Sequence, residues 1–219
     1  MKALLLAIAT AFAFQAQAKA QLLTTTPSSQ KLAGVTIAKS AMTMVNKQPV
    51  KLTTVAAGIR QDKPFFSEDN IYVGQLMVDN PSVIVKTNSG FLASSDNVKV
   101  GAITMSFVYF WVPESDIYKA FQDAFVANHV DMKNKSISAF LNVVSAAGSA
   151  GKNQTVTLLM VREPNGQRVL TYDNGAGYVG HVTGGPGFLH AIYSVWLGQP
   201  ADYEIAKLKN QWLNWKPAP

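Results

Sequence analysis

Runs of β-branched and aromatic residues bounded by turn-forming residues predict a series of strands. They cover residues 50–59, 70–78, 82–86, 100–112, 154–161, 168–172 and 175–182. Pro113 should end the fourth strand, because proline has no backbone N–H to donate to a sheet. The sequence Pro164-Asn165-Gly166 predicts a hairpin turn before the sixth strand, since Asn-Gly tolerates the positive φ angles of such turns.

Apolar residues at helical spacing predict four helices in the second half of the chain. The first follows Ser115, which should serve as its N-cap, and buries a stripe that includes Phe121 and Phe125. The other three helices should cover residues 134–147, 188–197 and 203–213, and Asp202 should cap the last of them. Runs of strands followed by runs of helices predict an α+β fold, with a layer of helices packed on one face of an antiparallel β-sheet.

The first 20 residues have the features of a secretory signal peptide. A positive start is followed by an uncharged apolar run over residues 3–14, and small residues favour cleavage after Ala18 or Ala20. The run is too short to span a bilayer, which needs about 20 residues. We therefore expect an exported protein, periplasmic or secreted, whose mature chain begins with a flexible, polar lead-in over residues 21–32.

Residues 33–219 should form a single domain, because no linker or repeat divides them. The chain contains no cysteine, so a disulfide framework, a thiolate metal site and a cysteine nucleophile are all excluded. Its formal charge is +6, but the lysines are scattered, which argues against a nucleic-acid partner. No second apolar run is long enough to span a membrane, so a soluble mature protein is expected.

The usual sequence motifs of catalysis are missing. There is no nucleophile elbow, no complete phosphate- or dinucleotide-binding glycine motif and no cluster of metal ligands. His129, His181 and His190 are far apart and have no carboxylate or histidine at ligand spacing, so structural or surface roles are expected for them. The sequence therefore predicts neither a metal site nor a cofactor.

Two segments resemble the chalcone isomerase family. Gly58-Ile59-Arg60 matches a Gly-[Ile/Val]-Arg pattern of that family, and Ile71-Tyr72-Val73 begins a matching strand about a dozen residues later. Residues 194–200, SVWLGQP, match the end of a helix near the C-terminus. With Leu170-Thr171-Tyr172 between them, these motifs resemble the exported bacterial branch of the family over about residues 33–212.

The resemblance implies an open-faced sandwich with a cleft around Arg60. In chalcone isomerases an arginine holds the oxyanion, and a threonine and a tyrosine hydrogen-bond near the ketone. Tyr72 takes the position of that threonine, and Tyr118 that of the tyrosine. Phe125 stands where the plant enzymes have an asparagine that contacts the flavonoid, which argues against flavonoid cyclisation.

Some members of the family bind fatty acids without catalysis, using the arginine and a tyrosine to hold the carboxylate. The resemblance therefore favours a non-catalytic binder of a small apolar or amphipathic ligand, a fatty-acid-like acid. Its head would meet Arg60 and Tyr72 or Tyr118, and its tail would lie beside Phe121 and Phe125.

Two alternatives remain open from the sequence. One is an isomerase or intramolecular lyase acting on a phenolic or carbonyl substrate, with Arg60, Tyr72 and Tyr118 as its catalytic residues. The other is an interaction protein of the cell envelope whose cleft has closed and whose Trp212 and Trp215 form a docking patch. A cavity beside Arg60 would distinguish the first from the second.

Overall fold

The structure, a computed structural model, describes residues 21–62 and 69–217. The predicted signal peptide, residues 1–20, lies outside the described residues. The strands are β1 (Thr24–Leu32), β2 (Val35–Val45), β3 (Gln48–Asp62), β4 (Asp69–Val78), β5 (Val100–Phe107), β6 (Trp111–Val112), β7 (Ala150–Gly151), β8 (Thr155–Arg162), β9 (Arg168–Asp173) and β10 (Val179–Gly184). The helices are α1 (Gly90–Ser95), α2 (Glu114–Ala127), α3 (Lys135–Ala147), α4 (Phe188–Leu197) and α5 (Tyr203–Asn214), with a 3₁₀ turn at Pro81–Val83.

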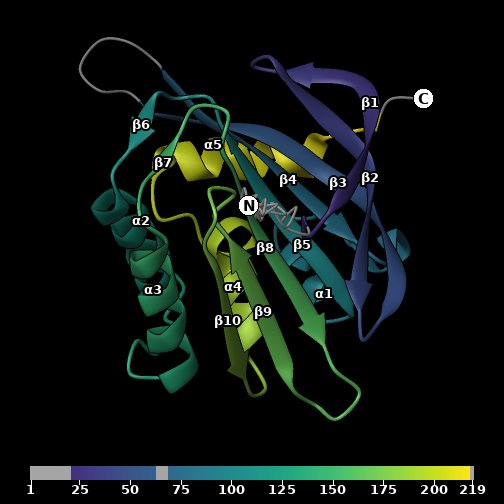
Figure 1. Cartoon of the computed structure of the whole chain (residues 1–219), viewed down its shortest axis with the longest axis vertical. Coiled ribbons are helices and arrows are strands. Elements are labelled where there is room, and N and C mark those ends of the chain that lie inside the picture. Colours follow the sequence, from purple (N-terminus) through teal and green to yellow (C-terminus); the bar gives the residue numbers. More distant parts are fainter. Residues whose placement is uncertain (1–20, 63–68, 218–219) are drawn as a thin grey trace, which may run out of the picture.

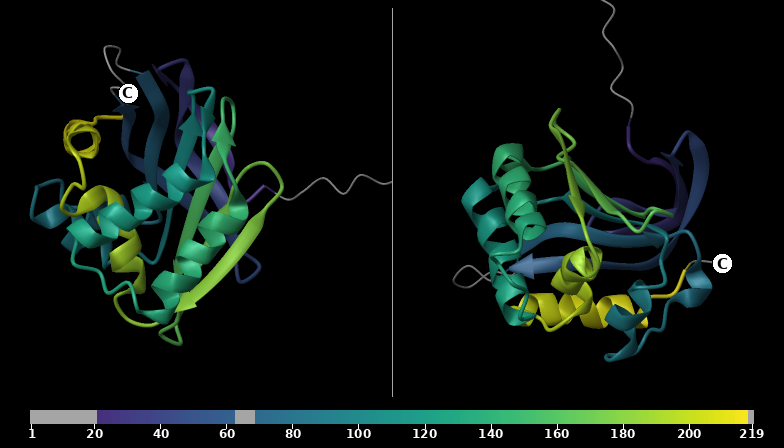
Figure 2. Two further views of the ribbon diagram at one scale, coloured as in Figure 1. Left: turned by 90° about the vertical axis from the view of Figure 1, so that its left-hand side faces the viewer. Right: turned by 90° about the horizontal axis from the view of Figure 1, so that it is seen from below.

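In this described part of the chain, eight strands form one sheet in the order β1-β2-β3-β4-β5-β8-β9-β10 (Figure 1). Every neighbouring pair in it is antiparallel. β6 and β7 form a separate short pair. The helices gather over one face of the large sheet (Figure 2), which confirms the predicted α+β architecture.

The main apolar core lies between the sheet and this helix layer. Its largest fully buried side chains include Trp196, Trp212, Phe125 and Phe140. A smaller apolar cluster, which includes Leu52 and residues of β2, β5 and β8, lies on the opposite face of the sheet. Among the described helices, none combines the length and the hydrophobicity that crossing a bilayer requires.

Two segments differ from the interpretation of the sequence. Residues 24–32, expected as part of a flexible lead-in, form the edge strand β1, which pairs with β2. A polar edge strand is compatible with this position, because one of its sides has no neighbouring strand. Residues 82–86, predicted as a strand, begin in a 3₁₀ turn in which the Asn80 side chain accepts a hydrogen bond from the Ser82 backbone N–H.

Other boundaries shifted. The strand predicted over residues 100–112 ends at Phe107, and β6 follows as a separate piece. Ser115 lies inside α2 rather than at its N-cap, a position that Pro113 occupies. The structure also contains β2 and α1, which were not predicted from the sequence.

Candidate functional site

Strand register places Arg60, Tyr72 and Phe107 in one row across the sheet. Arg60 on β3 pairs with Tyr72 on β4, and Tyr72 pairs with Phe107 on β5. Directly opposed residues of antiparallel strands project from the same face, and Tyr72 and Phe107 belong to the core beneath the helices. The ring centroids of Tyr72 and Phe107 are 5.7 Å apart. A cation, a phenol and an apolar ring therefore lie side by side under the helix layer.

Two paired glycines let α5 approach this row closely. Gly58, two residues before Arg60, pairs with Gly74 across β3 and β4. A Cβ atom on Gly58 would lie 2.9 Å from Cδ1 of Leu208, and one on Gly74 would lie 3.0 Å from Cζ2 of Trp212. Because glycine has no Cβ, the helix can pack directly against the strands. The close packing of α5 thus explains why the Gly-Ile-Arg motif has a glycine at position 58.

Asp202 connects the start of α5 to Arg60. Its Oδ1 accepts a hydrogen bond from the backbone N–H of Ile205 at 2.7 Å, so it caps the helix as predicted. Its Oδ2 lies 2.9 Å from Nη2 of Arg60, while Nη1 of Arg60 donates to the carbonyl of Gln61. The side chain of Arg60 is 17% exposed and that of Asp202 is 48% exposed. The guanidinium is therefore largely buried, whereas its partner remains accessible to solvent.

Tyr72 supplies a neutral hydroxyl next to this cation. Its Oη accepts a hydrogen bond from Nε1 of Trp196 at 3.1 Å, which leaves the O–H of Tyr72 free to act as a donor. Burial raises the pKa of Tyr72 above its usual value of 10.0, and the Trp196 hydrogen bond and the charge of Arg60 counteract the rise only in part. The phenol is thus protonated at neutral pH and can donate to an oxygen in front of it.

A cleft of about 380 Å³ opens beside the row, between the sheet and helices α2, α4 and α5. Its volume falls within the range of roughly 300–1,000 Å³ that is typical of small-molecule sites. Arg60 and Tyr72 share its lining with apolar side chains, which include Met105, Phe107, Ile117, Phe121, Val195, Trp196 and Ile205. The arrangement, mostly apolar with a few convergent polar groups, suits an amphipathic ligand.

Charged residues border the cleft. Among the described residues of its lining, four are carboxylates and two are cations: Asp62, Asp116, Asp123 and Asp202, against Arg60 and Lys119. Lys119 pairs with Asp123, with Nζ 2.7 Å from Oδ2. Since Arg60 pairs with Asp202, Arg60 and Lys119 each have a carboxylate partner within the chain.

The structure brings together three of the five predicted site residues, namely Arg60, Tyr72 and Phe121. Tyr118 and Phe125 lie outside the lining of the cleft. The hydroxyl of Tyr118 accepts a hydrogen bond from the Gln122 side chain at 3.4 Å, one turn further along α2. Phe125 is fully buried in the core, with its ring centroid 5.9 Å from that of Phe140.

Two polar residues of the site, Trp196 and Asp202, were not predicted from the sequence. Trp196 lies within the SVWLGQP segment that resembled the family, but its bond to Tyr72 spans 124 positions and leaves no local signal. Asp202 was predicted only as a helix cap. Its second contact, with Arg60, joins residues 142 positions apart, so it could not be read from spacing along the chain.

Asn128 fixes the loop that leads to Asp202. Its Oδ1 accepts a hydrogen bond from the backbone N–H of Gln199 at 2.7 Å. Its Nδ2 reaches three carbonyl oxygens at 2.8, 3.2 and 2.9 Å, those of Ala124, Ser194 and Gln199. A Cβ atom on Gly198 would lie 2.0 Å from Oδ1 of Asn128, so the loop passes too close for any other residue there. One side chain thus joins α2, the end of α4 and the loop before α5.

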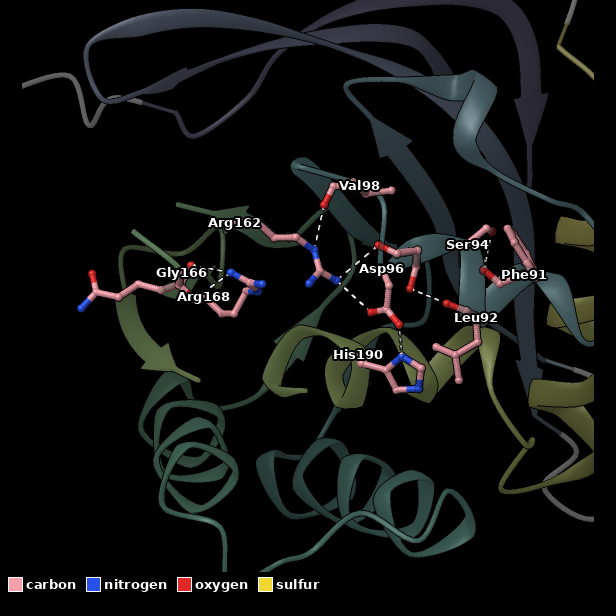
Figure 3. Close-up of polar contacts among 11 residues, drawn as sticks. Phe91, Leu92, Ser94, Asp96, Val98, Arg162, Gly166, Arg168 and His190 are labelled. Carbon is pink, nitrogen blue, oxygen red and sulfur yellow. Dashed lines mark hydrogen bonds and ion pairs between the residues drawn. The ribbon is translucent and has the colours of Figure 1, made fainter. Parts of the chain in front are cut away.

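A second polar cluster lies near the start of β5, whereas the cleft lies at the other end of this strand, beside Phe107 (Figure 3). Nη2 of Arg162 is 3.0 Å from Oδ1 of Asp96, and Oδ2 of Asp96 is 2.9 Å from Nδ1 of His190. Arg162 also donates from Nε to the carbonyl of Val98 at 2.9 Å. The cluster ties the turn after α1 to β8 and α4, and it does not border the cleft. Within residues 21–62 and 69–217, no group of three or more His, Asp or Glu residues is placed to hold a metal ion.

The C-terminal tryptophans do not form an exposed patch. Trp212 is fully buried against the sheet. The carbonyl of Trp215 accepts a hydrogen bond from Nζ of Lys86 at 2.8 Å, and that Nζ lies 5.3 Å from the centroid of the Trp215 ring. Together with the cavity beside Arg60, these contacts contradict the hypothesis of a closed cleft with a tryptophan docking patch.

Comparison with known families agrees with this architecture. The model of the chalcone isomerase-like family matches residues 29–214, which is most of the chain. The chain belongs to the chalcone isomerase-like family. Among solved structures, this chalcone isomerase-like protein is similar to a fatty-acid binding protein of Arabidopsis thaliana, with 14% identity and a TM-score of 0.56. The match covers 83% of this chain and 92% of the plant protein, and at such low identity it shows a common fold. No curated protein matches the chain.

Proposed function

We propose that this chalcone isomerase-like protein is a non-catalytic binder of a small amphipathic acid. The row of Arg60 and Tyr72 at the apolar cleft carries the proposal. A guanidinium presents parallel N–H donors to a carboxylate, and the phenol of Tyr72 adds a further donor beside it. The apolar side chains of the cleft would cover the tail of the ligand, and a plant protein of the same fold binds fatty acids.

The test is the binding of decanoate, measured by titration calorimetry, to the wild type and to Arg60→Gln. Loss of the charged head contact should weaken binding at least about tenfold, which corresponds to about 1.4 kcal/mol. Tyr72→Phe should weaken it less, because only one neutral donor is removed. Thermal melting of each variant shows that it is folded.

Arg162→Gln is a closely matched control. The side chain of Arg162 is 15% exposed and pairs with Asp96, whose side chain is 46% exposed, at 3.0 Å. These values nearly equal those of the Arg60–Asp202 pair, but neither Arg162 nor Asp96 lines the cleft. The control should bind decanoate within about twofold of the wild type. If Arg60→Gln binds as tightly as this control, the head-site hypothesis is wrong.

An isomerase or intramolecular lyase is the second candidate, and the state of Tyr72 favours it. A protonated phenol beside a guanidinium could stabilise an oxyanion that develops on a carbonyl or phenolic substrate. Purified protein would be incubated with chalcones of several hydroxylation patterns, and cyclisation followed by absorbance. A rate above buffer that disappears in Arg60→Gln would support catalysis, and no rate with any chalcone would count against it.

Export, and membership of the exported bacterial branch of the family, also belong to the proposal. They rest on the signal-peptide features of residues 1–20 and on the motif order along the chain. The intact mass of protein recovered from the periplasm or the medium should correspond to a chain that begins at Lys19 or Gln21. A mass that includes Met1 would contradict cleavage.

A further inference from the structure

We infer that Asp202 is a specificity-determining residue, which lowers the preference of the cleft for a carboxylate over an uncharged head group. The inference rests on the proposed function, since it concerns the same head site. It is carried by the contact of Asp202 Oδ2 with Nη2 of Arg60 at 2.9 Å. This carboxylate occupies a position on Nη2 that the carboxylate of a ligand would also need.

A carboxylate ligand has two ways to reach Arg60, and both are opposed by Asp202. It can displace Asp202 from Nη2, in which case one ion pair replaces another and the net gain is small. It can instead accept from the remaining N–H groups of Arg60, in which case two negative charges share one cation at close range. An uncharged hydroxyl or carbonyl oxygen meets neither obstacle, because it can accept from Tyr72 or Arg60 while the ion pair stays intact.

The other described charges of the border do not compensate for the charge of Asp202. Lys119, the other cation of the described lining, already pairs with Asp123 at 2.7 Å. Asp116 adds a further carboxylate to the described lining. The field at the head site is therefore less favourable to an anion than an isolated arginine would suggest.

The two oxygens of Asp202 have different partners, so one substitution can remove its charge and keep its cap. Oδ1 of Asp202 caps α5, and Oδ2 pairs with Arg60. Asparagine is as good an N-cap as aspartate, so Asp202→Asn should keep the cap and remove the charge. Asp202→Ala removes both, and its lower melting temperature would report the loss of the cap separately from the change in binding.

The experiment compares two probes of equal chain length, decanoate and 1-decanol, at neutral pH. The quantity measured is the ratio of their affinities, because a general change in the cleft affects both probes alike. Asp202→Asn and Asp202→Ala should each raise the ratio of decanoate to decanol affinity about tenfold over the wild type. Asp96→Asn, which removes a carboxylate of similar exposure from the distant Arg162 pair, should leave the ratio within about twofold.

Each outcome decides the inference. If both probes bind and Asp202→Asn leaves the ratio within about twofold, Asp202 does not set the head-group preference, while the proposed binding function stands. The same applies if Asp96→Asn shifts the ratio as much as Asp202→Asn does. If neither probe binds the folded wild type or the folded Asp202→Asn variant, the proposed function fails and the inference fails with it.

Discussion

Substitution of Asn128 by alanine should loosen the loop that carries Asp202 to the cleft. Asn128 is the C-cap residue of α2, and its amide contacts the loop between α4 and α5 from the side. Asn128→Ala leaves α2 and α4 unchanged in sequence. It therefore tests how the loop is held without changing any residue that borders the cleft.

The loss in the free energy of unfolding follows from the hydrogen bonds that the side chain of Asn128 makes. The carbonyl of Ala124 keeps the backbone N–H of Asn128 as a donor at 3.1 Å, and the carbonyl of Ser194 keeps the N–H of Gly198 at 2.9 Å. The backbone N–H of Gln199 loses Oδ1 of Asn128 as its acceptor at 2.7 Å, and the carbonyl of Gln199 loses Nδ2 of Asn128 as its donor at 2.9 Å. Two net hydrogen bonds of about 1 kcal/mol each give a loss of about 2 kcal/mol in the free energy of unfolding. For a chain of this size that is roughly 4–8 °C in melting temperature.

Urea unfolding followed by tryptophan fluorescence measures this loss, and decanoate titration measures its effect on the site. Asn134→Ala is the matched control, because Asn134 caps α3 with a single bond to the Ser136 N–H at 2.9 Å. The control should cost about 1 kcal/mol and leave affinity unchanged. Asn128→Ala should cost about twice as much and change decanoate affinity several-fold. Equal costs for the two variants, with equal affinities, would refute the role given to Asn128.

Two further predictions concern the core. Gly101→Ala would place Cβ 2.1 Å from Oη of Tyr193, a buried hydroxyl without a hydrogen-bond partner among the described residues, and should cost roughly 1–3 kcal/mol. Tyr193→Phe should restore most of that loss, and a double-mutant cycle that is additive would contradict the clash. Burial also raises the pKa values of Tyr72, Tyr172 and Tyr193 above 10.0, so the folded protein keeps protons that the unfolded chain loses. The contribution of these three tyrosines to the free energy of unfolding is complete below pH 10. Above pH 10 it should fall by up to about 4 kcal/mol per pH unit, because each of the three protons accounts for about 1.36 kcal/mol per pH unit. A free energy of unfolding that stays constant above pH 10 would contradict this.

The helices and the central strands could be predicted because their signals are local. Apolar side chains at helical spacing bury one face of α2 and α3, and Asp202 caps α5 within its own first turn. β1 and β2 lie at one edge of the sheet, where fewer side chains are buried and the apolar pattern is weaker. The apolar run Val83-Ile84-Val85 was misread as part of a strand, because the preceding Asn80–Pro81 sequence starts a 3₁₀ turn instead.

The candidate site shows the same division between local and distant determinants. Arg60 and Tyr72 were matched from motifs on two neighbouring strands, where antiparallel register leaves little freedom in which side chains oppose each other. Tyr118 was placed by counting across a loop, and one residue of error on a helix turns a side chain by about 100°. Phe121 faces the cleft and Tyr118 does not, although both lie on α2.

The head-group preference that we infer depends on Asp202, whose role as the N-cap of α5 does not require a negative charge. As an N-cap, position 202 needs only a side-chain oxygen, and Asp, Asn and Ser satisfy that need almost equally. A change among these residues should therefore alter the charge beside Arg60 while keeping the cap of α5. By contrast, Gly58 and Gly74 are constrained by the close packing of α5. The fold therefore holds the arginine and the tyrosine in place, while the cap beside them can be exchanged to favour an acid or a neutral ligand.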